Sequence, residues 1–126
     1  MDAILNYVVM QDSGGEALSS QMLRGIIEGC ILAIIDRQEV YGYEISERLA
    51  EYGFTSMSEG TIYPLLLRMQ REELVTSQMK KSTAGPRRKY YYLTGKGKEE
   101  LEDFIVRWAR LEKNVNNVLR NQKESK

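Results

Sequence analysis

The chain has 126 residues, of which 42% are hydrophobic and 29% charged, a composition expected for one globular domain with a modest core. Its formal net charge of zero excludes a whole-molecule attraction to nucleic acid or anionic lipid, so either partner would need a local patch. With one cysteine and no histidine, the sequence excludes an internal disulfide, a cysteine-based zinc site and the usual Ser-His or Cys-His nucleophiles, and we expect no metal, no cofactor and no enzyme.

Residues 1–19 begin with a small apolar group, Ile4 to Met10, and end in a turn-like segment rich in Ser and Gly. The apolar group fits a short strand, a helical turn or an arm packed on a neighbour, so we assign this part only to an N-terminal arm or extension. It lacks the basic-then-apolar order of a signal peptide. The longest apolar run, at 26–35, is shorter than the roughly 20 residues that cross a bilayer. We therefore expect a cytoplasmic protein with no membrane partner.

Residues 20–36 form the first predicted helix, with Ser20 as its N-cap. Apolar side chains cover most of its circumference, which predicts a largely buried helix. Gly25 and Gly29 lower helix propensity by roughly 1 kcal/mol each relative to alanine, but small residues four apart allow another backbone to approach closely. Cys30 lies on the apolar side, and we interpret it as a small buried hydrophobe rather than a reactive thiol.

A second helix is predicted after a polar turn at 36–40, and it ends at Gly53, a typical C-cap residue. Ile45, Leu49 and Tyr52 recur at helical spacing and are expected to share its buried face. A short connection leads to the next helix. Two helices joined in this way indicate a helix-turn-helix.

The third helix is predicted over 58–74, with the Ser58 hydroxyl accepting a backbone N–H of the first turn and Glu59 near the positive end of the helix dipole. Pro64 leaves two starts open. If Ser58 is the cap, Pro64 lies in the second turn and removes a hydrogen bond; if the regular helix begins nearer Thr61, Pro64 lies in the tolerated first turn. The predicted buried face consists of Ile62, Leu65, Leu66 and Met69.

The hydrophobic period changes after this helix. Residues 75–80 alternate as a strand does, 81–88 form a loop with a Gly-Pro break, and 89–93 are rich in β-prone aromatic residues. A helix-turn-helix followed by such a hairpin is a winged helix. The predicted fold class is therefore mainly α with a small β-hairpin (α+β): a winged helix-turn-helix domain over 20–94, then a long C-terminal dimerisation helix over 95–126.

Thr94 is the predicted cap of this last helix, which runs to about Arg120 and would be on the order of 40 Å long. Its apolar residues step by three and four in alternation, as in a coiled-coil seam. A small winged domain cannot bury all of this stripe, so we predict a homodimer through the same helix of a second subunit. The predicted interface consists of Leu101, Phe104, Ile105, Trp108, Leu111, Val115 and Val118.

The neutral net charge hides an asymmetry. Residues 68–96 hold eight Lys and Arg residues but only two acids, Glu72 and Glu73. A basic third helix and wing are the footprint of a nucleic-acid surface. The alternative is a set of solvated surface charges, which suffices for Arg71 or Lys80 alone. The run 87–89 at a loop tip beside a helix-turn-helix favours contact with phosphates or the minor groove.

Four motifs resemble the signature of the PadR family of bacterial transcriptional regulators, in order and with the usual gaps over about Leu23 to Leu101. They are YGYEI at 41–45, SEGTIYPLL at 58–66, GPRRKYY at 85–91, and Leu93-Thr94 with Gly97. The single C-terminal helix resembles the short-tailed, LmrR-like subgroup. The N-terminal segment before Met22 departs from that pattern, being longer than in the shortest members.

The resemblance implies a homodimeric winged-helix repressor that binds an operator on double-stranded DNA, often beside genes of multidrug or stress response. A dimer would place two copies of the recognition helix 58–74 on a palindromic site, with the basic wing 80–89 beside each. The predicted DNA-binding residues are Tyr43, Ser58, Glu59, Thr61, Tyr63, Arg68, Lys81, Arg87, Arg88 and Lys89.

In LmrR-like members a tryptophan of the last helix lines a flat apolar pocket at the dimer centre, where planar drugs stack, and Trp108 occupies the matching place. A small planar hydrophobic ligand that releases the DNA is thus expected, while plain core packing of Trp108 is the alternative. The expected ligand-binding residues are Phe104, Trp108, Leu111 and Val115. The alternative function is a winged-helix dimer for protein interaction or ligand sequestration, without specific DNA binding.

Overall fold

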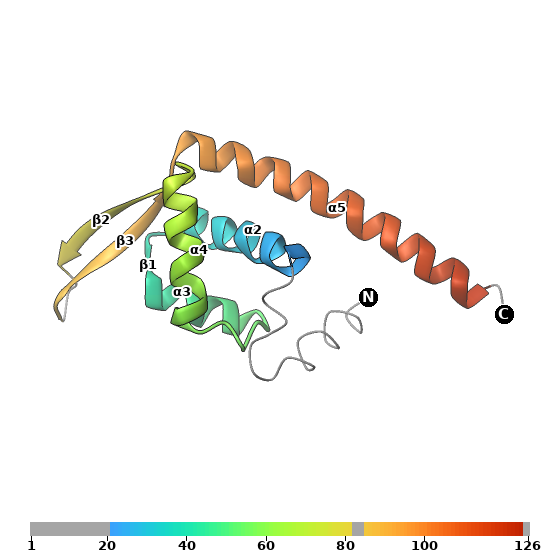
Figure 1. Ribbon diagram of the computed structural model, residues 1–126, viewed down its shortest axis with the longest axis horizontal. Helices are drawn as coiled ribbons and strands as arrows, with labels where there is room; N and C mark the ends of the chain where they lie inside the picture. Colours follow the sequence, from blue (N-terminus) through green and yellow to red (C-terminus); the bar gives the residue numbers. More distant parts are fainter. Residues whose placement is uncertain (1–20, 82–84, 125–126) are drawn as a thin grey trace.

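The computed structural model describes residues 21–81 and 85–124, so the predicted arm 1–19 and the Ser20 cap lie outside the described residues. Helices carry the fold, and a small antiparallel sheet lies at one end (Figure 1). In chain order the elements are α2 (Gln21–Arg37), β1 (Val40–Tyr41), α3 (Gly42–Glu51), α4 (Glu59–Arg71), β2 (Val75–Lys81), β3 (Arg87–Leu93) and α5 (Gly95–Glu124).

Helix α2 lies at the centre of the core, as its apolar circumference predicts. It contacts α5, α3 and β3, and Ile27 and Ile31 are fully buried. Full burial of such a side chain stabilises the fold by about 1.5–3 kcal/mol. Cys30 is half-buried on the same helix, and burial raises the pKa of its thiol, which disfavours the reactive thiolate.

The helix-turn-helix consists of α3 and α4. Gly53 has a φ of 111°, a conformation that glycine adopts without strain, and it ends α3 as predicted, one position after the C-cap residue. The predicted burial of Tyr52 is wrong, because this side chain is 61% exposed. Tyr52 is the C-cap residue, where the chain leaves the buried face of α3. Its hydroxyl accepts a hydrogen bond from the Arg37 guanidinium, which lies 5.5 Å from the ring centroid.

Regular helix in α4 begins at Glu59, so Pro64 lies inside the second turn, the first of the two predicted alternatives. Pro64 has no N–H for the carbonyl of Gly60, which lies on the exposed face. Ser58 occupies the N-cap position, as predicted. The predicted hydrogen bond from a backbone N–H to its hydroxyl is absent. That hydroxyl lies 3.4 Å from the hydroxyl of Thr61 instead, while the Ser58 carbonyl accepts the first backbone hydrogen bonds.

The predicted hairpin is present, and its strands β2 and β3 pair in register from Val75 opposite Leu93 to Lys81 opposite Arg87. A third strand, β1, adds to the other edge of β3. The assignment of Val40 to a polar turn is wrong, since this residue pairs with Tyr91 and is fully buried. A strand of two residues is too short to show the alternation that identifies strands in a sequence.

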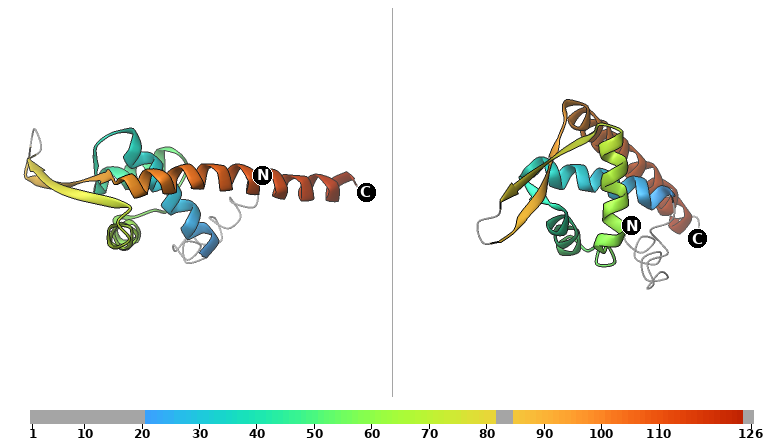
Figure 2. Two further views of the ribbon diagram at one scale, coloured as in Figure 1. Left: turned by 90° about the horizontal axis from the view of Figure 1, so that it is seen from above. Right: turned by 60° about the vertical axis from the view of Figure 1, so that its left-hand side comes forward.

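Helix α5 begins beside the sheet, crosses α2 and then projects well beyond the rest of the domain (Figure 2). Thr94 caps it as predicted, because its hydroxyl accepts the Gly97 N–H at 2.9 Å. Leu101, one of the predicted interface residues, is only 7% exposed and is part of the domain's own core. None of the helices in the described part of the chain combines the length and the apolar character needed to cross a membrane.

Candidate nucleic-acid interface

The strand register divides the basic residues of the wing between two faces. Alternate residues of a strand share a face, as do residues directly opposite each other on neighbouring strands. Ser77 lies opposite Tyr91, and the Gln70 amide of α4 donates a hydrogen bond to the Ser77 hydroxyl at 3.2 Å, so this face adjoins α4. We call it the α4 side of the wing. Farther toward the tip it carries Met79, Lys81, Arg87 and Lys89.

The opposite face of the wing, its far side, holds its basic residues in local contacts. The Lys80 ammonium and the Tyr92 hydroxyl both donate to the Glu39 carboxylate, at 2.5 and 2.8 Å. The hydrogen bond from Lys80 is the main reason why the pKa of Glu39 is lowered. The guanidinium of Arg88 lies 4.4 Å from the ring centroid of Tyr41. Arg88, a predicted DNA-binding residue, therefore lies on the side of the wing that does not adjoin α4.

The outward face of α4 is formed by residues that recur at steps of four, three and four. They are all exposed, and opposite them the buried side chains of Ile62, Leu66 and Met69 fix the helix on the core. On this face the side chain of Leu67 is 55% exposed. Its residues are Gly60, Pro64, Leu67 and Arg71.

Predicted polar contact residues gather around the first half of α4. Tyr63 rests against the start of α3, where a Cβ on Gly42 would lie 2.8 Å from the Tyr63 hydroxyl, so glycine leaves room for the ring. Tyr63 remains 46% exposed, and Tyr43, in the first turn of α3, is 48% exposed. With the neighbouring hydroxyls of Ser58 and Thr61, this end of α4 presents several groups that hydrogen-bond a phosphate or a base edge. The predicted Glu59 is exposed in the same turn.

Arg68 is on the flank of α4 that faces α2. Its Nε donates to the Glu72 carboxylate at 2.8 Å, and its Nη1 lies 3.3 Å from Glu28 Oε2. That oxygen is buried, and the 3.3 Å contact does not have the geometry of a hydrogen bond. Burial raises the pKa of Glu28, and Arg68 opposes this rise. Arg68, a predicted DNA-binding residue, thus forms ion pairs within the domain, while its side chain is 49% exposed.

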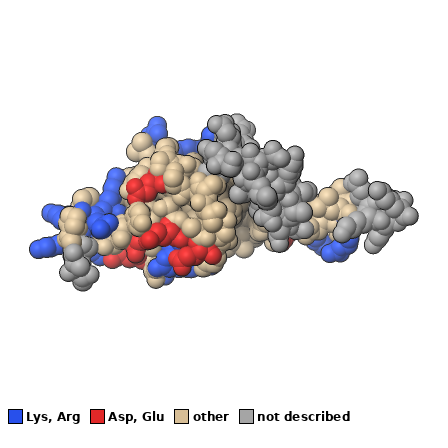
Figure 3. All heavy atoms as spheres, turned by 90° about the horizontal axis from the view of Figure 1, so that it is seen from below, with Lys and Arg blue, Asp and Glu red and all other residues tan. Residues whose placement is uncertain are grey.

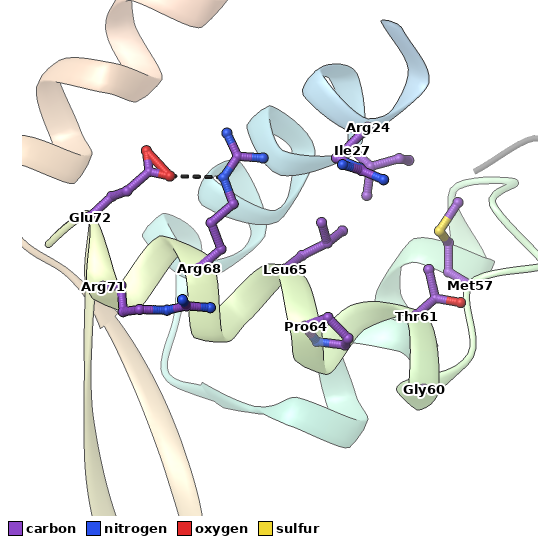
Figure 4. A pocket seen from close by; sticks show the side chains of 10 residues that line it. All are labelled: Arg24, Ile27, Met57, Gly60, Thr61, Pro64, Leu65, Arg68, Arg71 and Glu72. Atoms are coloured by element: carbon purple, nitrogen blue, oxygen red, sulfur yellow. Dashed lines mark hydrogen bonds and ion pairs between the residues drawn. The ribbon is translucent and has the colours of Figure 1, made fainter. Parts of the chain in front are cut away.

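A hollow of about 590 Å³ lies between α2 and α4 (Figure 4). Apolar side chains, among them Ile27 and Leu65, line it together with Arg24 and Arg71. Both of these arginines are exposed, so their guanidinium groups can bind a phosphate along this flank of α4. The sequence analysis missed Arg24, which stands outside the basic span 68–96 and carries no motif signal.

Charge is unevenly distributed over the surface (Figure 3). Lys and Arg gather at the wing end, whereas Asp and Glu gather over the middle of the face shown. Helix α3 supplies Glu44, Glu47 and Glu51 to the acidic part of the chain. Within the described ranges, no group of three or more His, Cys, Asp or Glu residues is placed to hold a metal ion.

A second hollow, of about 350 Å³, lies between α2 and α5. It brings together three of the four predicted ligand-binding residues, Phe104, Trp108 and Leu111, with Gly25 and Ile26 of α2 and Arg107. Val115 does not line it. In the single chain several residues of the predicted seam remain exposed: Ile105 at 57%, Leu111 at 45%, Val115 at 38% and Val118 at 64%.

Comparison with known proteins agrees with the predicted resemblance. The model of the "Transcriptional regulator PadR-like family" matches residues 31–103. A crystal structure of a PadR-like transcriptional regulator from Bacillus cereus strain ATCC 14579 has 57% sequence identity and a TM-score of 0.74, and the match covers 79% of this chain and 97% of that one.

The negative transcriptional regulator PadR of Bacillus subtilis (strain 168) is 30% identical over 84 residues, 65% of this chain and 46% of that protein. The crystal structure of Bacillus subtilis PadR in complex with operator DNA has 29% identity and a TM-score of 0.58, covering 64% of this chain and 47% of that one. The chain thus spans about half the length of that relative. These relatives are regulators rather than enzymes, as expected. Because the family model matches more than half of its residues, the chain belongs to the PadR-like family of transcriptional regulators.

Proposed function

We propose that this protein is a dimeric repressor that binds a palindromic operator through α4 and the α4 side of the wing. The relative that binds operator DNA supports the choice of partner. The observation that carries the proposal is that Lys81, Arg87 and Lys89 share the wing face adjoining α4, in strands without an acidic residue. A regulator bound to its operator acts in the cytoplasm.

The parts of this surface have different tasks in the proposed complex. The outward face of α4 enters the major groove, where base edges are distinguishable. Tyr63, Thr61 and Ser58 hydrogen-bond phosphates or bases at its start, and the cations of the wing neutralise phosphates. Arg24 binds the DNA backbone from the flank of α4 that faces α2, and Arg71 binds it from the end of the outward face. Arg68 has no part in the interface, because its ion pairs hold it on the flank of α4 that faces α2. Arg88 has none, because it lies on the far side of the wing.

Dimerisation follows from the free part of α5. Leu111, Val115 and Val118 form an apolar stripe that is exposed in one chain, and a second copy of the same helix would bury it. A two-fold axis through this pair would present two α4 helices to successive major grooves, about 34 Å apart on one side of the duplex.

The two faces of the wing provide a matched test on a duplex from the protein's own upstream region. We expect Arg87→Ala with Lys89→Ala, on the α4 side, to weaken binding at least tenfold and to reduce the salt slope by about 0.9 for each lost phosphate contact. Lys80→Ala with Arg88→Ala removes the same charge from the far side. This double variant should leave the affinity for DNA and the salt slope nearly unchanged. Fluorescence anisotropy over a series of salt concentrations measures the difference.

Equal losses in the two double variants would contradict the proposed orientation of the wing. If the wild type binds neither this duplex nor fragments selected from random DNA, the winged helix serves as a scaffold for protein interaction or ligand sequestration instead.

The hollow beside Trp108 supports a ligand-responsive repressor. Phe104, Trp108 and Leu111 offer flat apolar surface, and a second subunit over the open side would complete a slot for a planar hydrophobic ligand. Trp108 is the only tryptophan of the chain, so its fluorescence reports directly on this place. Titration with a planar cationic dye should quench the fluorescence and release bound DNA. No quenching across a broad panel of planar compounds would mean that Trp108 serves packing alone.

A further inference from the structure

The centre of the outward face of α4 is apolar. Leu67 is 55% exposed, with Pro64 before it and Arg71 after it on the same face. Single exposed leucines are common on protein surfaces and need no explanation by themselves. This one lies in the middle of the face that, in the proposed function, lies against the base edges. There it would lose contact with water on binding, and its chemistry would select what lies opposite.

We propose that Leu67 is a specificity-determining residue that packs against the C5-methyl group of a thymine, at one position in each half-site of the operator. This inference rests on the proposed function and deepens it. Leucine has neither a donor nor an acceptor, and thymine is the one base with a methyl group in the major groove. Guanine, cytosine and adenine present polar atoms there, which would be desolvated against Leu67 without a hydrogen-bond partner.

The surroundings of Leu67 favour a defined contact. Its helix is fixed on the core by Ile62, Leu66 and Met69, all 1% exposed, so the backbone that carries Leu67 is held firmly. One turn before it, the Tyr63 ring lies against Gly42 at the start of α3. On this face Leu67 is therefore a firmly placed apolar knob between Pro64 and Arg71. Such a knob discriminates by shape and desolvation rather than by hydrogen bonds.

Replacing thymine by deoxyuridine tests this, because it removes the methyl group and nothing else. The site is first selected from random duplex DNA with the wild-type protein, and each thymine is then replaced singly in the selected duplex. From the free energy of burying one methyl group, we expect one position per half-site at which deoxyuridine weakens binding about fourfold, and roughly fifteenfold when both half-sites are changed. In Leu67→Ala the same replacement should have no effect.

Two further variants guard against indirect effects. Val106 is 54% exposed on α5, so Val106→Ala removes a comparable aliphatic group outside the proposed interface and should keep the full deoxyuridine effect. Leu67→Gln gives the helix a bidentate partner for adenine, and sites selected with it should lose thymine at the position in question. Alanine and glutamine are both good helix formers, so α4 should keep its fold, which circular dichroism checks.

The outcomes separate the two proposals. If the wild type binds DNA with a steep salt dependence but no deoxyuridine position responds, or if Leu67→Ala responds as strongly as the wild type, the Leu67 contact is overturned and the repressor function stands. If the wild type selects no DNA sequence at all, the proposed function itself fails.

Discussion

The two halves of α5 carry one continuous apolar pattern but meet different surroundings. In the first half Leu101 is 7% exposed, and the Phe104 ring packs over Gly29 of α2. In the second half Leu111 and Val118 are 45% and 64% exposed. A heptad pattern thus indicates which residues need cover, not which chain supplies it. The domain itself covers the first turns, and in the proposed dimer the second subunit covers the rest.

The largest effect is expected from placing negative charge on the exposed apolar stripe in the second half of α5. Leu111→Glu with Val118→Glu would bury carboxylates in the proposed interface of both subunits, and we expect the dissociation constant of the dimer to rise on the order of a thousandfold. The fold of each chain should persist. Sedimentation at micromolar concentration checks this, with Val106→Glu as the control. A wild type that sediments as a single subunit would refute the dimer outright.

A deletion in the first half should act on folding instead. Leu101→Ala removes a buried side chain from the domain core, and such changes cost about 2–4 kcal/mol in the free energy of unfolding. Urea denaturation at one fixed protein concentration measures it, because dimerisation makes stability concentration-dependent. The folded variant should still dimerise. A variant with unchanged stability but weaker association would place Leu101 in the interface after all.

Substitutions at Gly29 and Gly25 of α2 test how closely the first half of α5 packs on that helix. A Cβ on Gly29 would lie 2.5 Å from ring atoms of Phe104, whereas a Cβ on Gly25 meets nothing within 4 Å. Gly25→Ala should stabilise by about 1 kcal/mol through helix propensity. Gly29→Ala gains the same propensity but overpacks the contact, which costs about 1–3 kcal/mol. Thermal denaturation compares the two, and an equal gain in both would show that Phe104 does not rest on Gly29.

How far the sequence leads depends on whether a feature is local. The end of α3 at Gly53, the Thr94 cap and the long amphipathic helices follow from neighbouring residues, and the predictions for them are confirmed. The strand at Val40 could not be predicted from neighbouring residues, because it forms by pairing with β3, which is distant in the chain. Tyr52 has the spacing of a buried residue, but it comes where the helix already ends.

The site shows the same limit. Sequence composition identifies a basic helix and wing, but it does not show which Lys and Arg side chains have partners within the fold. Arg88 and Lys89 are neighbours in the chain, and the pleat sends them to opposite faces of the sheet. Arg68 looks like a contact residue until α2 brings Glu28 to it. Only a folded chain reveals such partners, because each comes from a different element.

The last and smallest prediction concerns Glu28, a partly buried carboxylate of α2 beside the first half of α5. Burial is the main reason why the pKa of Glu28 is raised from 4.5; Arg68 and Arg24 oppose the rise, while Glu72 and Glu100 add to it. The native state therefore binds more protons than the unfolded state as the pH rises above 4.5. Stability is lost as the pH rises through this window, and the cost stays at its full value above the raised pKa.

Glu28→Gln removes the titration while keeping the shape. The difference in thermal midpoint between variant and wild type should thus shift in favour of the variant from pH 4.5 upward and level off above the raised pKa of Glu28, by less than the effect of Gly29→Ala. Glu47→Gln, at an exposed position of α3, serves as the control. A difference that stays flat with pH would mean that Arg68 compensates Glu28 fully. A shift toward the wild type would mean that the ion pair outweighs burial, and the first half of α5 would then cover a stabilising charge pair rather than a costly one.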